Sequence, residues 1–348
     1  MRIGILIPTY NRKKFLARSV ASAVRQTHTD LEVLVIDDHS DDGTAELIAE
    51  LSDPRLRYIY NARNAGLIEN INRGIDFFSN EVQWCMILCD DDILDNDCIA
   101  KLVKSLMITN AKTIIHSHRI FVDEQDNIIG EATVSPQEET ALHYLQERAI
   151  FWRQTYITGV LFNRKAFDEV NGYPRFSTGL AADDAFIFAL SLKDRLVFEP
   201  DAVSYIRLHE GAESIISSGG IKKLHTLEEF KDYCYKTVMT SGAFGKKELR
   251  RFKWAVEKYL KSLNSAWWIQ TASDVFRQKD KDSGSFAELL SLVKDDSARF
   301  SLRVKCDTAL LRHAGVYPEV NRYYRLFWTA ISEISHFFDI RIRHPRVR

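Results

Sequence analysis

The chain has 348 residues, with 47 Lys and Arg against 48 Asp and Glu and a formal net charge of −1. This balance gives no reason to expect a nucleic-acid partner, and the length allows two domains or one domain with a large extension. Five scattered cysteines without a Cys-x-x-Cys pair suit a reducing cytosol and argue against a zinc ribbon or a disulfide framework. No apolar run is long enough to span a bilayer, and residues 3–8 are too short for a signal peptide.

Apolar runs alternate with amphipathic stretches along the first part of the chain. The runs that resemble buried strands are residues 3–7, 31–36, 57–60 and 86–88. The stretches with helical periodicity between them are residues 13–26, 45–51 and 68–78. Strand alternating with helix predicts an α/β fold with a doubly wound, mostly parallel sheet. In such a sheet ligands bind at the carboxyl ends of the strands.

Three polar loops follow these predicted strands, at residues 8–12, 37–44 and 90–92. Turn and capping chemistry could explain each loop alone, but folding gives no reason for all three to be so rich in Asp, Asn and Thr. Asp38 could accept hydrogen bonds from a nucleobase or a ribose hydroxyl. Neither Gly-x-Gly-x-x-Gly nor a Walker motif occurs, so a glycine-rich loop is not expected to hold phosphates.

Asp90, Asp91 and Asp92 form an uninterrupted acidic triplet. Their charges repel one another, and a divalent cation would remove that penalty, because Mg²⁺ and Mn²⁺ prefer carboxylate oxygens together with substrate phosphates. The alternative is a solvated acidic turn that caps the next helix.

The ordered set of residues 5–12, 35–44 and 90–92 resembles glycosyltransferase family 2, the inverting, GT-A fold enzymes that use nucleotide sugars. The resemblance covers residues 1–215 and implies a GT-A domain there, followed by a helical region at 216–348. It also implies a divalent metal, Mn²⁺ or Mg²⁺. The nucleotide-binding residues that it implies are Pro8, Thr9, Tyr10, Arg12, Asp38, Asn64, Arg73, Asp90 and Asp91.

Two alignments of the acidic triplet stay open. Cys89 can occupy the first position of the family's Asp-x-Asp-Asp motif, or Asp90 and Asp92 can form the motif. Asp92 is the metal candidate under both, with His209 near the metal or the diphosphate. A family arginine falls at Ile71, so Arg63 and Arg73 are the candidate substitutes for it.

Asp183 and Asp184 begin a helix that is otherwise apolar. They suit an N-cap and the helix dipole, but direct displacement also needs a carboxylate that takes the proton of the acceptor hydroxyl. The pair resembles the family's Glu-Asp motif. We assign Asp184 as the base and Asp183 as its neighbour, an order that is open by one position.

Three histidines and one arginine could have either a structural role or a role in binding a metal or phosphate. His116 and His118 share one face of a predicted strand, which we interpret as an ordinary strand pair rather than a metal pair. Arg207 and His209 match an Arg-x-His pattern of the family, with Arg207 charged for phosphates. A structural histidine is the alternative for His209.

The last third is predicted to be helical, at residues 224–239, 246–268 and 286–292. Aromatic residues at helical spacing between 320 and 338, followed by arginines, are typical of a helix on an anionic membrane surface. A helix packed on the protein's own core is the favoured alternative, and a dimer contact is another; the oligomeric state is unknown.

The predicted activity is inverting, metal-dependent transfer of a sugar from a UDP-, GDP- or dTDP-sugar to a hydroxyl of a glycan or a lipid-linked acceptor. The resemblance implies bacterial surface polysaccharide synthesis, in the cytoplasm or at the inner face of the plasma membrane. One alternative is a sugar-nucleotide nucleotidyltransferase, which usually carries a glycine-rich loop after its first strand. Another is a non-catalytic nucleotide-binding module, which would leave Asp183 and Asp184 unexplained.

Overall fold

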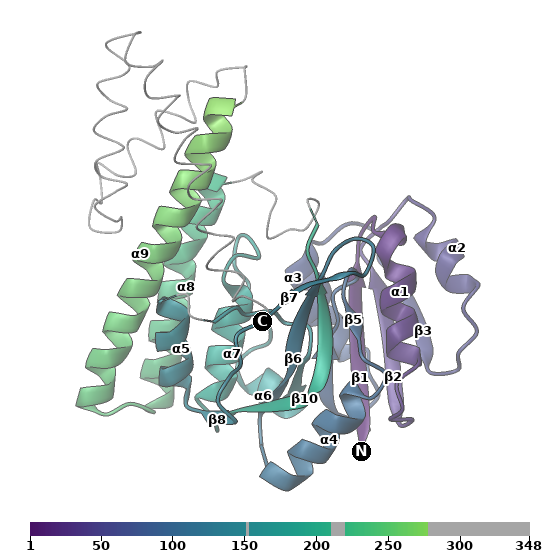
Figure 1. Ribbon diagram of the computed structural model, residues 1–348, viewed down its shortest axis with the longest axis horizontal. Coiled ribbons are helices and arrows are strands. Elements are labelled where there is room, and N and C mark those ends of the chain that lie inside the picture. The colour runs from purple at the N-terminus through teal and green to yellow at the C-terminus, as the bar shows by residue number, and fades with distance from the viewer. Residues whose placement is uncertain (151–152, 210–219, 278–348) are drawn as a thin grey trace. The chain divides into compact units, whose positions relative to one another are not determined.

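The computed structural model describes residues 1–150, 153–209 and 220–277 (Figure 1). One compact unit takes Met1–Ile216 and Glu228–Ala255, and a second takes Ser217–Leu227 and resumes at Val256. The domain boundary at residue 215 stays a prediction. The predicted helix at 286–292 and the aromatic, basic segment at 318–348 lie outside the described residues. None of the described helices has both the length and the apolar character needed to cross a membrane.

One sheet of ten strands runs through the described part of the first unit, in the order β3–β2–β1–β4–β9–β6–β10–β5, with β7 beside β6 and β8 beside β10. The parallel strands of one half are β1 (Arg2–Thr9), β2 (Leu31–Asp37), β3 (Leu56–Tyr60) and β4 (Val82–Ile87). In the other half β6 (Ile114–Val122) is parallel to β10 (Leu196–Arg207), and β9 (Val160–Asn163) runs antiparallel between β4 and β6. The shorter strands are β5 (Ile93–Leu94), β7 (Ile128–Glu131) and β8 (Glu138–Glu139).

This pairing fixes where the site lies. Because β9 is antiparallel to both β4 and β6, the strands β1, β2, β4, β6 and β10 all point the same way. Their carboxyl ends therefore share one edge of the sheet, where ligands of α/β proteins bind. The predicted α/β fold with a mostly parallel sheet is confirmed.

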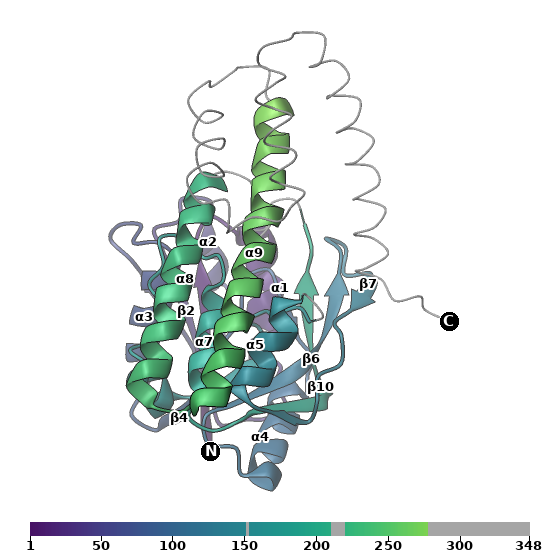
Figure 2. The same ribbon diagram turned by 90° about the vertical axis from the view of Figure 1, so that its left-hand side faces the viewer.

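Helices cover both faces of the sheet (Figures 1 and 2). The core on one face includes residues of α1 (Lys13–Val24), α2 (Thr44–Ala49) and α4 (Cys98–Thr109). The other face carries α3 (Leu67–Asp76), α6 (Arg164–Glu169) and α7 (Ala182–Ser191), with α5 (Ala141–Ala149) packed on α7. The chain continues through α8 (Gly220–Ser241) and α9 (Lys246–Arg277).

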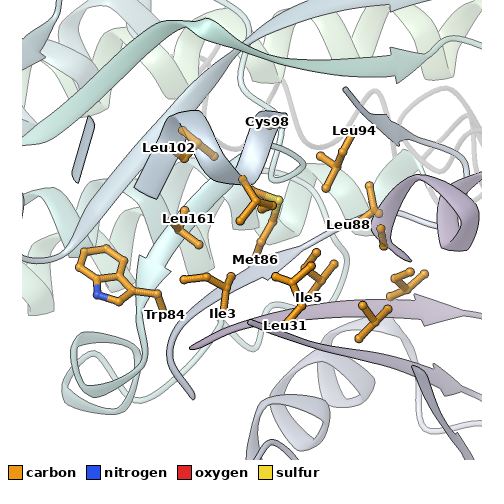
Figure 3. Packing of buried hydrophobic residues seen from close by; sticks show 14 of the residues in the cluster. Ile3, Ile5, Leu31, Trp84, Met86, Leu88, Leu94, Cys98, Leu102 and Leu161 are labelled. Atoms are coloured by element: carbon orange, nitrogen blue, oxygen red, sulfur yellow. The ribbon is translucent and has the colours of Figure 1, made fainter. Parts of the chain in front are cut away.

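The core explains the apolar runs. Ile3 and Ile5 of β1 point to the α1 and α4 side together with Met86 and Leu161 (Figure 3). Leu6 points to the opposite side, as the two-residue period of a strand requires. A Cβ on Gly74 would lie 2.5 Å from Leu6 Cδ1, so the glycine lets α3 approach β1 closely.

Candidate active site

The loops that follow β1, β2 and β4 meet at the carboxyl edge of the sheet. The hydroxyl of Thr9 donates to Asp90 Oδ2 over 2.7 Å, and the backbone N–H of Asp38 donates to the carbonyl of Thr9 over 2.9 Å. Thr9 is buried, as is Pro8 before it, whereas Tyr10 is exposed. The three polar loops are thus brought together, and Thr9 is the residue that joins them.

Asp91 contacts two basic side chains that the sequence separates widely. His209, just beyond β10, has Nε2 2.9 Å from Asp91 Oδ2. Arg12, between β1 and α1, has Nη1 3.6 Å from the same oxygen and 3.3 Å from His209 Nε2. The His209 ring packs 4.8 Å from the Phe15 ring, centroid to centroid, which fixes its plane. A carboxylate, an imidazole and a guanidinium therefore lie in contact at the carboxyl edge of the sheet.

Asp92 faces the protein interior. Its side chain is buried, and its Oδ1 accepts the backbone N–H of Arg207 over 2.9 Å. The Arg207 guanidinium, predicted to serve phosphates, is fully buried. It donates to the carbonyls of Asp91 and Asp123 over 2.8 and 2.6 Å. Arg207 therefore ties the end of β10 to the acidic triplet.

Electrostatics in the triplet favour a bound cation. Burial raises the pKa of the Asp90 carboxyl, and the neighbouring charge of Asp91 adds to the rise. Burial, followed by the Asp91 charge, also raises the pKa of Asp92 well above its ordinary value. Both causes disfavour the ionised carboxylate, and an adjacent cation would oppose them.

The donor atoms also fit a metal ion. Among the described residues, Cys89, Asp91 and Asp92 form a group whose potential ligand atoms lie within 4.8 Å of one another. Mg²⁺ and Mn²⁺ prefer oxygen ligands to sulfur, so the Cys89 thiol is the least suited of the three. Asp91 belongs both to this group and to the contact with His209, whose Nε2 lies 2.9 Å from Asp91 Oδ2.

Asp38 organises the loop between β3 and α3. Its Oδ1 accepts hydrogen bonds from Asn61 Nδ2 and the Ala65 N–H, both over 2.9 Å. Its Oδ2 accepts the Gly66 N–H over 2.7 Å. The side chain of Asn64 accepts the same N–H over 3.0 Å. Asp38 and Asn64 thus shape the rim of the site beside Thr9.

The two candidate arginines differ in position. Arg63 is exposed on the loop that Asp38 organises, two residues from Asn61. Arg73 is exposed in the last turn of α3, about 9 Å along the helix axis from Leu67 at a rise of ~1.5 Å per residue. The structure therefore places Arg63, rather than Arg73, beside the other candidate nucleotide-binding residues.

Asp184 belongs to a buried ion pair. Arg148 of α5 donates to it through Nε and Nη2, over 2.6 Å to Oδ1 and 2.9 Å to Oδ2. The Tyr144 hydroxyl donates to Oδ1 over 2.8 Å. Only 4% of Asp184 is exposed. Both of its oxygens are thus engaged in packing α5 against α7.

Asp183 is half-buried in the first turn of α7. The Tyr173 hydroxyl donates to its Oδ1. Burial raises the pKa of Asp183 to about 6, with Tyr173 opposing the rise and Asp184 adding to it. The charge of Asp183 in turn raises the pKa of the Cys89 thiol, so Asp183 lies within electrostatic reach of the end of β4. A carboxyl with a pKa near neutrality is suited to general base catalysis.

The two histidines singled out from the sequence, and two residues before β9, have structural partners. His116 is buried against the Phe198 ring, and His118 contacts Glu131. Burial keeps the pKa of His116 well below its ordinary value. Gly159 has a φ of +81°, and a Cβ there would overlap Ser117 Oγ. Thr158 accepts the Cys89 N–H over 3.1 Å.

The chain matches the family model described as Glycosyl transferase family 2 over residues 4–170. It is 24% identical over 223 residues to an uncharacterized glycosyltransferase of a Nostoc species, covering 63% of this chain and 68% of that one. It is 23% identical over 222 residues to the Escherichia coli UDP-Glc:alpha-D-GlcNAc-diphosphoundecaprenol beta-1,3-glucosyltransferase WfgD, covering 64% and 82%.

Solved structures share the fold. TarS 1-349 of S. aureus in complex with UDP-GlcNAc aligns with a TM-score of 0.61 at 14% identity, covering 96% of this chain and 92% of that one. The mannosyltransferase PcManGT of Pyrobaculum calidifontis, in complex with GDP-Man and Mn²⁺, aligns with a TM-score of 0.51 at 16% identity, covering 97% and 87%. The resemblance predicted from the motifs is confirmed.

Proposed function

The chain belongs to glycosyltransferase family 2, and we propose that it transfers a sugar, with inversion, from a nucleoside diphosphate donor to a hydroxyl of a lipid-linked or growing glycan. The observation that carries this proposal is the convergence of Arg12, Asp91 and His209 at the strand ends, next to the loops of Thr9 and Asp38. A relative that acts on a diphosphoundecaprenol-linked sugar supports the acceptor class.

Asp91 and His209 are the proposed ligands of a Mn²⁺ or Mg²⁺ ion. When bound, such an ion stabilises the negative charge that develops on the departing diphosphate. Arg12 contacts the same carboxylate, and its guanidinium is suited to bind a phosphate oxygen. The Oδ1 of Asp92, the metal ligand predicted from the sequence, accepts the Arg207 N–H, and we propose that Asp92 supports Asp91.

Asp183 is the proposed general base. Its raised pKa, about 6, leaves it ionised at neutral pH yet able to take the proton of an acceptor hydroxyl. Asp184, the base predicted from the sequence, has both oxygens bound by Arg148. We thus assign Asp183 to catalysis and Asp184 to the packing of α5 against α7.

A transfer assay tests this proposal. The full chain is incubated with Mn²⁺, a lipid-diphosphate-linked sugar and, in turn, a UDP-, GDP- or dTDP-sugar, and the glycosylated lipid is quantified. One donor should give product. Asp183→Asn should lower turnover by about 10²–10⁴-fold with donor binding retained, and Asp184→Asn should act on stability. No product from any donor, or full turnover in Asp183→Asn, would contradict the proposal.

A further inference from the structure

Tyr173 is fixed at both its backbone and its side chain. Its backbone N–H donates to Asn72 Oδ1 over 2.8 Å, and its carbonyl accepts from Asn72 Nδ2 over 3.0 Å. Its hydroxyl donates to Asp183. Both Tyr173 and Asn72 are buried. One side-chain amide thus satisfies both backbone polar groups of the residue that holds the proposed base.

The local chain is built for this arrangement. Gly172, immediately before Tyr173, has a φ of +81°, and a Cβ there would overlap Asn72 Oδ1. The Tyr173 ring packs 5.2 Å from the Phe186 ring, centroid to centroid. Phe186 lies three residues after Asp183 on α7, on the same side of the helix. The ring is therefore aimed at the start of α7 by contacts on both sides.

Asn72 links this arrangement to the donor side of the site. It belongs to α3, and the residues just before α3 donate their N–H groups to Asp38. Within α3, Asn70 Nδ2 donates to the carbonyl of Ile36 at the end of β2 over 2.9 Å. One short helix is therefore anchored to the proposed nucleotide loop at its start and to Tyr173 about one and a half turns later.

We propose that Tyr173 is a positioning residue for the base: its hydroxyl holds the Asp183 carboxylate toward the acceptor, and Asn72 holds Tyr173 from the donor side. This inference rests on the proposed function, in which Asp183 takes the acceptor proton. Tyr173 itself does not exchange a proton with substrate.

The groups around Asp183 determine in which direction its pKa should change when the Tyr173 hydroxyl is removed. Those that face it are Tyr173, the Ile157 backbone, Asp184 of α7, Arg119 of β6 and Cys89 after β4. Tyr173, Ile157 and Arg119 favour the ionised carboxylate, and Asp184 opposes it. Removal of the Tyr173 hydroxyl takes away a donor to the charged form, so Asp183 should hold its proton to a higher pH.

Tyr144 provides a matched control, because it contacts Asp184, the residue that follows Asp183 on α7. Tyr144 is also buried and donates its hydroxyl to a buried aspartate, Asp184, over 2.8 Å. Tyr173→Phe and Tyr144→Phe therefore remove the same chemical group from neighbouring carboxylates. Both keep the aromatic ring, so both variants should fold, and thermal unfolding verifies this.

The test is the pH profile of kcat/KM for sugar transfer in the full chain. We expect Tyr173→Phe to move the acidic limb upward by about one pH unit with the donor KM unchanged, and Tyr144→Phe to leave the limb in place. As a second variant, Asn72→Ala should lower kcat by more than about fivefold at an unchanged donor KM, since displacement of a positioned group acts on the chemical step.

Two results would overturn the inference. An acidic limb that stays in place in Tyr173→Phe, while Asp183→Asn abolishes transfer, would show that the base is correct but that Tyr173 does not position it. A limb that moves in Tyr144→Phe and not in Tyr173→Phe would assign the base to Asp184. Full turnover in Asp183→Asn is a separate outcome, because it removes the proposed base itself.

Discussion

His209 Nε2 lies 2.9 Å from Asp91 Oδ2, although 118 residues separate them in the chain. The contact exists because β10 runs parallel to β6 and ends at the edge where β4 ends. It makes Asp91, the middle carboxylate of the triplet, the one that meets a histidine, a side chain suited to bind a metal ion.

Substitution of Asp91 should weaken metal binding while the protein stays folded. We expect Asp91→Asn to weaken Mn²⁺ binding by more than about tenfold, measured by titration calorimetry in the presence of a nucleoside diphosphate. Asp92→Asn is the matched control, because an amide oxygen can still accept the Arg207 N–H. Its Mn²⁺ affinity should stay within about threefold of the native value. The reverse order of effects would make Asp92 the ligand.

Sugar transfer should depend on pH through Asp183. Its pKa is raised to about 6, chiefly by burial. Below that pH the carboxyl is protonated and cannot accept the acceptor proton, whereas above it the carboxylate is ionised. We expect kcat/KM to fall about tenfold per pH unit on the acidic side of the limb. A profile that stays flat down to pH ~5 would rule out a base of this pKa.

The ion pair between Arg148 and Asp184 should stabilise the fold. Asp184→Asn leaves a guanidinium buried without its partner, which we expect to lower the free energy of unfolding by about 3–5 kcal/mol. Glu169→Gln breaks the exposed pair with Lys193 and should cost less than about 1 kcal/mol. Denaturant unfolding of both variants measures the difference. Equal, small losses would contradict the structural role of Asp184.

Gly159 is expected to be intolerant of a side chain. Gly159→Ala would place a Cβ against the Ser117 and Ser204 hydroxyls, at a φ of +81°. We expect a loss of about 1–3 kcal/mol in the free energy of unfolding, seen as a lower melting temperature. Gly66→Ala is a useful comparison, because φ there is +88° but a Cβ would meet nothing within 4 Å. A loss no larger at Gly159 than at Gly66 would mean that backbone strain, not crowding, decides the effect.

Much of the parallel half of the sheet could be predicted from the sequence. The apolar runs that became β1, β2 and β4 are buried along most of their length, which gives them a continuous apolar pattern. The convergence of their loops follows from parallel topology alone. The short strands β5 and β8, each of two residues, were not predicted, because so few residues carry no periodicity.

The roles of residues within the site were harder to assign, because they depend on the direction in which each side chain points. Asp183 and Asp184 are both acidic and adjacent, and only the partners on α5 and on the loop before α7 distinguish them. Adjacent helical residues point about 100° apart, so one reaches Arg148 and the other reaches Tyr173. Tyr173 itself was not identified as a functional residue, because its contact with Asp183 depends on how the loop before α7 folds.

The location of a bound manganese ion tests the proposed donor site most directly. Crystals of the full chain grown with Mn²⁺ and the nucleoside diphosphate of the active donor are measured at the manganese absorption edge. We expect one anomalous peak within coordinating distance of Asp91 and His209, next to the diphosphate. A diphosphate bound at the strand ends without such a peak, or a peak coordinated elsewhere, would contradict the proposed metal site.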